Sequence, residues 1–167
     1  MGMEKVIAVG AEELAASADR AVIHRGEPSV VCLWYERLPP SFGPAQAYLV
    51  EERVQWELNP EPAVTRFSFL QRRPGLTREE FARHWYDVHT PLARKHHPCL
   101  VRYVQNVVVA TLTPDTPDLD GIAELSVERA DDFDERMYDS PEGREIVAAD
   151  VRTFIDLSAG WRVVTTK

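Results

Sequence analysis

One stretch, residues 76–92 (LTREEFARHWYDVHTPL), constrains the fold more than any other part of the chain. Thr77 is a good N-cap and Glu80 follows three residues later, a spacing that predicts a capping box at the start of a helix. Apolar residues then recur at helical spacing, at Phe81, Trp85, Val88 and Leu92. The stretch therefore predicts a helix that packs its apolar face against another layer.

Pro91 should end or kink this helix near His89 and Thr90, because its ring would clash with the carbonyl of Asp87. Thr90 and Pro91 then suit the N-cap and first residue of a second short helical segment. His89 is expected at a helix C-terminus, four residues after Trp85 and on nearly the same side. That end of a helix favours a cationic imidazole. The alternative, a half-buried histidine that only caps carbonyls, stays open at this point.

Composition and charge exclude several classes of function. The 167 residues suit one domain or two small halves sharing a core, and the 44% hydrophobic and 28% charged content is typical of a globular protein. The net charge of −8 argues against a nucleic-acid surface, which needs clustered lysine and arginine. Neither a membrane-spanning run nor a signal-peptide pattern is present, and Cys32 and Cys99 have no framework or metal spacing. We therefore expect a cytoplasmic protein with no nucleic-acid or membrane partner.

The order of predicted elements indicates the fold class. Strands are predicted at residues 5–9, 30–36, 47–57, 64–71, 100–110, 121–127 and 161–165. Helices are predicted at 11–20 and 76–92, with a helical start at 131–138 and a further helix from 140 to 155. Residues 60–62 are the best linker candidate, and residues 113–120 must be loop. Beyond the linker the order is strand, helix, strand, strand, helix, strand. This order predicts an α+β fold of the ferredoxin-like kind, an antiparallel sheet with helices on one face.

A sequence similarity within the chain relates the first sixty residues to the second part. The segment VVCLWYER (30–37) aligns without gaps on IAELSVER (122–129), with three identities at matching places. We therefore predict two parts: residues 1–60, a degenerate and shortened half lacking one strand and most of a helix, and residues 61–167, the complete unit. Two sheets would then pack face to face within one chain.

Polar groups on otherwise buried elements are the candidates for chemistry. His89, Tyr103 and Asp150 would suit proton transfer in an apolar pocket, as an imidazole base or acid, a phenol that polarises a carbonyl, and an orienting carboxylate. A structural reading stays open, in which Asp150 only bonds a backbone or arginine group. The residues predicted to bind substrate are His84, Trp85, Asn106 and Glu124.

Other patterns give weaker signals. His84 and His89 are five residues apart, so they should face different sides of a helix and not chelate a metal together. His96 and His97 follow basic residues and are expected to face solvent. Trp34, Trp56 and Trp161 suit core packing. No nucleophile, phosphate-loop or dinucleotide motif is present, and no metal or cofactor is predicted.

The second part resembles the EthD-like family of the dimeric α+β barrel superfamily. The residues that carry the resemblance are FLQRRPGLTREEFARHWYDVHTPLA (69–93), RYVQNVV (102–108), DGIAEL (120–125), SPEG (140–143) and DVRTFID (150–156). The whole chain is similar to long actinobacterial members, with a shortened first half. The resemblance implies ferredoxin-like units that pair into a barrel, here partly within one chain, usually without a cofactor. It also implies an acid/base role for His89 and a homodimer, since an incomplete first sheet would leave an edge for another copy.

Two functions from different classes follow. One is a cofactor-independent cyclase, isomerase or dehydratase acting on a small aromatic or polyketide-like molecule. The other is a non-catalytic binding or accessory protein for a hydrophobic metabolite or a partner oxygenase. A third possibility is heme-dependent or cofactor-free oxygen chemistry, known among superfamily relatives. A cavity of several hundred cubic ångströms beside His89 and Tyr103 would favour catalysis, and His89 tied to backbone carbonyls in a closed interior would favour binding.

Overall fold

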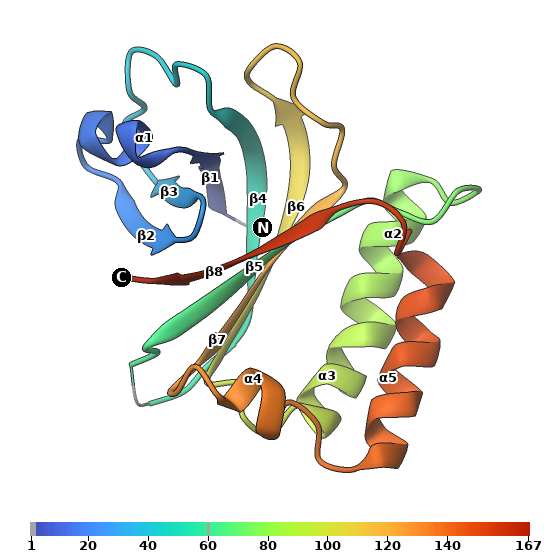
Figure 1. The fold of residues 1–167 in the computed structure, drawn as a ribbon. Coiled ribbons are helices and arrows are strands. Elements are labelled where there is room, and N and C mark those ends of the chain that lie inside the picture. Colours follow the sequence, from blue (N-terminus) through green and yellow to red (C-terminus); the bar gives the residue numbers. More distant parts are fainter. Residues whose placement is uncertain (1–2, 60) are drawn as a thin grey trace.

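The computed structural model describes residues 3–59 and 61–167 and contains a closed barrel of antiparallel strands (Figure 1). The strands are β1 (Met3–Gly10), β2 (Val22–Gly26), β3 (Val30–Trp34), β4 (Gln46–Glu57), β5 (Val64–Leu70), β6 (Arg102–Thr111), β7 (Gly121–Val127) and β8 (Trp161–Thr166). The helices are α1 (Glu12–Ser17), α2 (Arg78–His84), the π-helical turn η1 (Trp85–His89), α3 (Thr90–His96), α4 (Asp132–Glu135) and α5 (Pro141–Phe154). The order around the barrel is β1-β3-β2-β8-β5-β7-β6-β4. The predicted α+β class with an antiparallel sheet is confirmed.

Each half of the chain supplies four neighbouring strands of the barrel. The first half has the order β4-β1-β3-β2 and the second half β6-β7-β5-β8. Strand β4 pairs along its length with β6, and β2 pairs with β8 only at Arg25 with Thr166 and Gly26 with Thr165. The two sheets therefore join edge to edge into one closed barrel, and the expected open edge is absent from the part of the chain described.

The first half has one strand more than predicted. Strand β2 was missed because VIHRG is short and only His24 in it is buried, so it lacks the alternation of a half-buried strand. The second helix of this half is indeed missing, since residues 35–45 between β3 and β4 form turns and loop only. Of the predicted linker, Pro60 lies outside the described residues, and residues 61–63 form neither helix nor strand.

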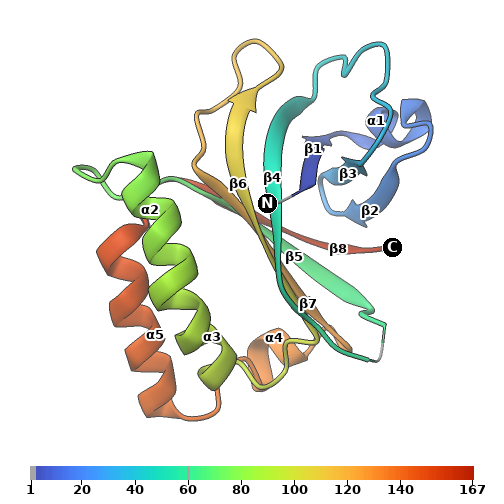
Figure 2. The ribbon, with the colours of Figure 1, turned by 180° about the vertical axis from the view of Figure 1, so that it is seen from behind.

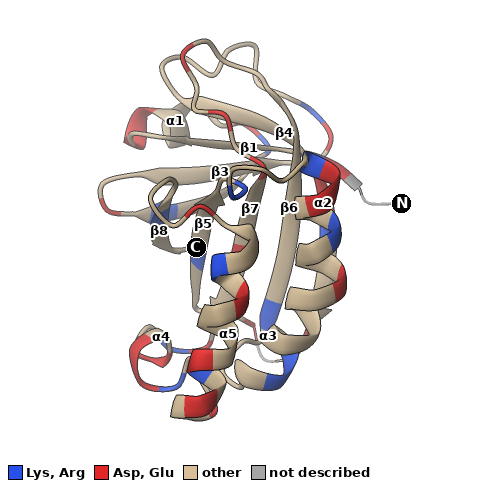
Figure 3. Cartoon of the chain, turned by 90° about the vertical axis from the view of Figure 1, so that its right-hand side faces the viewer, with Lys and Arg blue, Asp and Glu red and all other residues tan. Residues whose placement is uncertain are grey.

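The helices of the second half form a layer on the outside of the barrel. Segments α2, η1 and α3 follow one another as one helix, and α5 lies beside it over the sheet of β5 to β8, whereas α1 lies with the first half (Figures 1 and 2). Acidic and basic positions both occur along α5 and α2, and α3 carries basic positions only (Figure 3), as on a solvated face. No helix within residues 3–59 and 61–167 is both long and apolar enough to span a bilayer.

The predicted capping box begins the central helix. The Glu80 backbone N–H donates to Thr77 Oγ1 (3.1 Å), and the Thr77 backbone N–H donates to Glu80 Oε2 (2.8 Å). The predicted second helical segment is α3, which begins at Thr90 with Pro91 in its first turn, but η1 joins it to α2, so the helix is continuous to His96. In this wider turn the Thr90 N–H bonds the carbonyl of Trp85, five residues earlier, so the helix accommodates a proline that cannot donate.

The wider turn also changes which residues face the sheet. Phe81 and Trp85 are buried as predicted, but Val88 is 44% exposed and Leu92 is only half-buried. One extra residue in the turn rotates the following segment, so His89 and Ala93 take the buried positions instead. The π-helical turn therefore decides that the imidazole of His89 faces inward.

The capping box gives a first prediction, about stability. Replacing Thr77 by alanine removes the hydroxyl acceptor for the Glu80 N–H, so the free energy of unfolding should fall by about 1 kcal/mol. Urea denaturation followed by circular dichroism measures this change. Replacement by serine, which keeps the acceptor, should cost far less, and an equal loss in the two variants would contradict the role of the cap.

Candidate active site

The candidate site is a cavity of about 120 Å³ between the outer face of the second-half sheet and the helix layer. His89 and Trp85 of η1 line it on the helix side, together with Val147 and Val151 of α5. Tyr103 of β6 lines it on the sheet side. His89 is only 8% exposed, so its ring points into the protein and not into bulk water. The cavity is smaller than the several hundred cubic ångströms considered from the sequence, but it does lie beside His89 and Tyr103.

Behind His89 lies a carboxylate that binds two histidines. Asp150 of α5 contacts His89 Nδ1 through Oδ2 (2.8 Å) and His84 Nε2 through Oδ1 (2.7 Å). The prediction that His84 and His89 face different sides is wrong, because the π-helical turn brings residues five apart to one side. The side chain of Asp150 therefore binds two imidazoles and not the backbone or arginine group that the structural alternative expected.

Hydrogen bonding fixes the roles of these groups. Burial alone would raise the pKa of Asp150, but the hydrogen bonds from His89 and His84 hold that pKa below its ordinary value. The carboxylate is therefore ionised and accepts the Nδ1–H of His89. This arrangement leaves Nε2 of His89 as the nitrogen free to exchange a proton, the arrangement of an orienting acid behind a general base.

Tyr103 lies under η1 and is fully buried. The indole Nε1 of Trp85 donates to its hydroxyl (2.8 Å), and Gln105 Nε2 approaches the same oxygen (3.3 Å). Burial raises the pKa of Tyr103 to about 12, so the phenol keeps its proton at neutral pH. With donors on its oxygen, the hydroxyl proton can point into the cavity.

Gln105 is a residue that the sequence reasoning missed. Its amide donates to the carbonyl of Trp85 (3.0 Å) and to Thr90 Oγ1 (2.8 Å), and so ties η1 to strand β6. The signal was present, because Gln105 follows Tyr103 by two residues on a strand and must face the same layer. A buried polar residue at that position needs a partner in the helix.

His96 and His97 are buried, so the prediction that they face solvent is wrong. Helix α3 extends to His96, which bonds Asp139, and His97 Nδ1 bonds the carbonyl of Met137 (2.8 Å). Burial lowers the pKa of His97 to about 4, so this ring is neutral at physiological pH. His97 also lines the cavity and presents a neutral imidazole to it.

Two predicted substrate-binding residues lie elsewhere. Asn106 and Glu124 point into the barrel, on the face of the sheet opposite Tyr103. They join an ion network in which Lys5 of β1 bonds both Glu52 of β4 and Glu124 of β7, and Arg102 bonds Glu124 (2.9 Å). Neither Asn106 nor Glu124 can therefore touch a molecule beside His89. Of the other two, Trp85 lines the cavity, and His84 lies behind it against Asp150.

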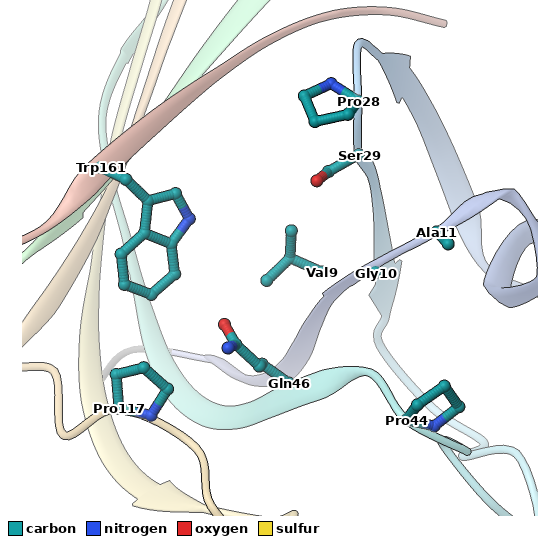
Figure 4. Close-up of a pocket in the computed structure, with 9 residues that line it drawn as sticks. All are labelled: Val9, Gly10, Ala11, Pro28, Ser29, Pro44, Gln46, Pro117 and Trp161. Atoms are coloured by element: carbon teal, nitrogen blue, oxygen red, sulfur yellow. The ribbon is translucent and has the colours of Figure 1, made fainter.

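A larger cavity, of about 480 Å³, opens at one end of the barrel. Val9, Gln46 and Trp161 surround it together with Pro28, Ser29 and Pro117 (Figure 4). Its lining residues include no side chain that titrates near neutral pH, whereas His89 and His97 line the smaller cavity. Within residues 3–59 and 61–167, no three histidine, cysteine, aspartate or glutamate side chains are grouped to hold a metal ion.

Comparison with known families decides the assignment. The model of the EthD domain matches residues 73–158, just over half of the chain. The chain belongs to the EthD family. The matched segment of this EthD protein runs from the turn before α2 to the loop after α5, and so contains the central helix with His84 and His89, Tyr103 and Asp150. Among curated proteins, no sequence match was found.

Two solved structures share the fold of this EthD protein. An anthrone oxidase-like protein superposes with a TM-score of 0.65 at 12% identity, over 98% of this chain and 90% of the other. A Fusobacterium nucleatum protein provisionally named a monooxygenase superposes with a TM-score of 0.57 at 6% identity, over 99% of this chain and 92% of the other. At these identities the likeness shows the fold alone. Because the matches span almost the whole chain, they include the first half as well as the EthD segment.

Proposed function

We propose that this EthD protein is a cofactor-independent enzyme of the cyclase, isomerase or dehydratase kind, which acts on a small aromatic or polyketide-like molecule. The observation that carries the proposal is the pair of Asp150 and His89, at 2.8 Å, beside a cavity of about 120 Å³. A single aromatic ring occupies a cavity of about this size, on the order of 150 Å³ for benzene.

The proposed reaction is a proton transfer. Nε2 of His89 takes a proton from a carbon next to a carbonyl, the electron pair moves to the carbonyl oxygen, and the Tyr103 hydroxyl donates a hydrogen bond to that oxygen. Asp150 stabilises the resulting imidazolium. The imidazolium then returns its proton to another carbon in an isomerase, or to a departing hydroxyl group in a dehydratase.

The experiment that tests this proposal measures proton exchange directly. Aromatic hydroxyketones and lactones that carry a hydrogen on the carbon next to the carbonyl are incubated in deuterium oxide, and loss of that proton signal is followed by NMR. The wild-type protein should exchange at least one of them, and His89→Gln should abolish the exchange with a melting temperature within a few degrees of wild type. Exchange that survives in His89→Gln would show that this histidine is not the base.

A second function starts from the same proton abstraction. The names of the two structural neighbours refer to oxidation, and a carbanion formed at His89 could react with molecular oxygen without a cofactor. Oxygen consumption that accompanies exchange would favour this route. The non-catalytic alternative, a binding or accessory protein for a hydrophobic metabolite or a partner oxygenase, requires binding of the same molecules with no exchange at all.

We further propose that residues 1–60 and 61–167 are two ferredoxin-like units, and that one chain builds the barrel that two chains build elsewhere. The strand orders of the two halves support this, because β4-β1-β3-β2 and β6-β7-β5-β8 are the same order of first to fourth strands, written in opposite directions. The sequence similarity between residues 30–37 and 122–129 then relates β3 to β7, the third strand of each unit. The homodimer stays a prediction, although a second copy is not needed to close this barrel.

A further inference from the structure

Two arginines on the sheet side of the cavity have no carboxylate partner. Arg66 of β5 and Arg162 of β8 both line the cavity that His89 lines. Acidic residues outnumber basic ones 27 to 19 in this chain. Even so, within residues 3–59 and 61–167 no carboxylate oxygen lies within 4.0 Å of either guanidinium, although nine other lysine and arginine side chains are ion-paired.

The register of the strands places the two arginines together. Arg162 lies opposite Ser68, two residues along β5 from Arg66, and side chains at this spacing share one face of the sheet. Arg66 is partly buried and its Nε has no hydrogen-bond partner, while its Cζ lies 4.7 Å from the centroid of the Phe133 ring. Burial and the neighbouring charge of Arg162 lower the pKa of Arg66 to about 10, so it stays protonated at neutral pH.

The geometry also relates these arginines to the proposed reacting end. Tyr103 pairs with Leu125, and Leu125 pairs with Arg66, so Tyr103 and Arg66 lie two strands apart across the sheet. Two strand spacings amount to about 10 Å. A flat molecule of one or two rings could therefore reach from His89 and Tyr103 at one end to a guanidinium at the other.

We propose that Arg66 and Arg162 bind a carboxylate group of the ligand, so that the molecule this pocket takes is a flat aromatic acid. A guanidinium binds a carboxylate through two parallel N–H bonds, which satisfies the free Nε of Arg66. The anion also removes the repulsion between the two like charges. This inference rests on the proposed function for the position of the reacting end, but the anion site itself is tested by binding alone.

The test compares a carboxylate with its neutral amide by isothermal titration calorimetry. We expect 2-naphthoate to bind the wild-type protein on the order of 10- to 100-fold more tightly than 2-naphthamide, as hydrogen bonds to a charged partner imply. Arg66→Met keeps the apolar stem and should abolish this preference, and Arg162→Met should reduce it. Arg66→Lys should retain part of it, which separates loss of charge from loss of fold.

Two controls make the outcomes distinct. Arg25→Met removes an arginine far from the cavity, one exposed and paired with Glu12, and should keep the wild-type preference. His89→Gln should also keep it, so failure of the acid/base proposal leaves this result intact. Equal binding of the two probes to wild type, no binding of either at millimolar concentration, or an unchanged preference in Arg66→Met would each overturn the carboxylate site.

Discussion

Replacing Asp150 with asparagine is expected to lower kcat for the exchange reaction by about 10²–10⁴-fold, with little change in KM. The carboxylate accepts the Nδ1–H of His89 and so leaves Nε2 unprotonated, ready to take a proton. An asparagine amide can instead donate to Nδ1, which favours the tautomer whose Nε2 already carries hydrogen. It also removes the negative charge that stabilises the imidazolium.

A matched control exists because Asp150 binds a second histidine. His84→Gln removes the other partner of the carboxylate and leaves the contact between His89 and Asp150 in place. We expect His84→Gln to lower kcat by less than about tenfold, in line with the loss of one hydrogen bond. A loss in His84→Gln as large as in Asp150→Asn would indicate that the trio is structural. Undiminished exchange in Asp150→Asn would contradict the orienting role outright.

Replacing Lys5 with methionine should lower the free energy of unfolding by about 3–5 kcal/mol. Lys5 is buried inside the barrel and bonds both Glu52 and Glu124, which are 8% and 1% exposed. Without the ammonium group, Glu52 loses this ion pair and Glu124 keeps only its ion pair with Arg102. The barrel then encloses an uncompensated negative charge. Because Lys5 belongs to the first half and Glu124 to the second, the contact between the halves weakens. Guanidinium denaturation measures the change.

The pH dependence of this loss identifies its cause. Burial alone would raise the pKa of Glu124, but Lys5 and Arg102 hold it at about 2. In wild type, this carboxylate therefore stabilises the fold above pH 4.5, and the contribution is lost as the pH falls toward 2. Without Lys5 the pKa of Glu124 should rise, so the loss of unfolding free energy in Lys5→Met should become smaller as the pH falls from 7.5 to 5. A deficit that does not change with pH would indicate lost packing instead.

An exposed pair in the same half provides the comparison. Arg25 and Glu12 form an ion pair at 3.3 Å with both side chains more than half exposed. Solvent screens such pairs, and Arg25→Met should change the free energy of unfolding by less than about 1 kcal/mol. A similar loss of unfolding free energy in Arg25→Met and Lys5→Met would mean that the buried network stabilises the protein no more than an exposed ion pair does.

Local patterns predicted much of this protein. The capping box at Thr77 and Glu80, the strands of the second half and the antiparallel α+β class follow from hydrogen-bonding chemistry and hydrophobic periodicity within short windows. The position of His89 four residues after a buried tryptophan was predicted in the same way. Strand β2 was not predicted because a short strand with mostly exposed side chains has no hydrophobic periodicity to detect.

The amino-acid sequence by itself determined where most elements of the second half lie and that Phe81 and Trp85 of the central helix are buried. Only the tertiary structure decided that His84 and His89 share one carboxylate, and that Asn106 and Glu124 belong to the barrel interior. The reason is that a π-helical turn depends on its contacts outside the helix, here the bonds of Gln105 to Trp85 and Thr90. Likewise, the sheet face that meets the helices is fixed by closure of the barrel, which pairs strands more than forty residues apart.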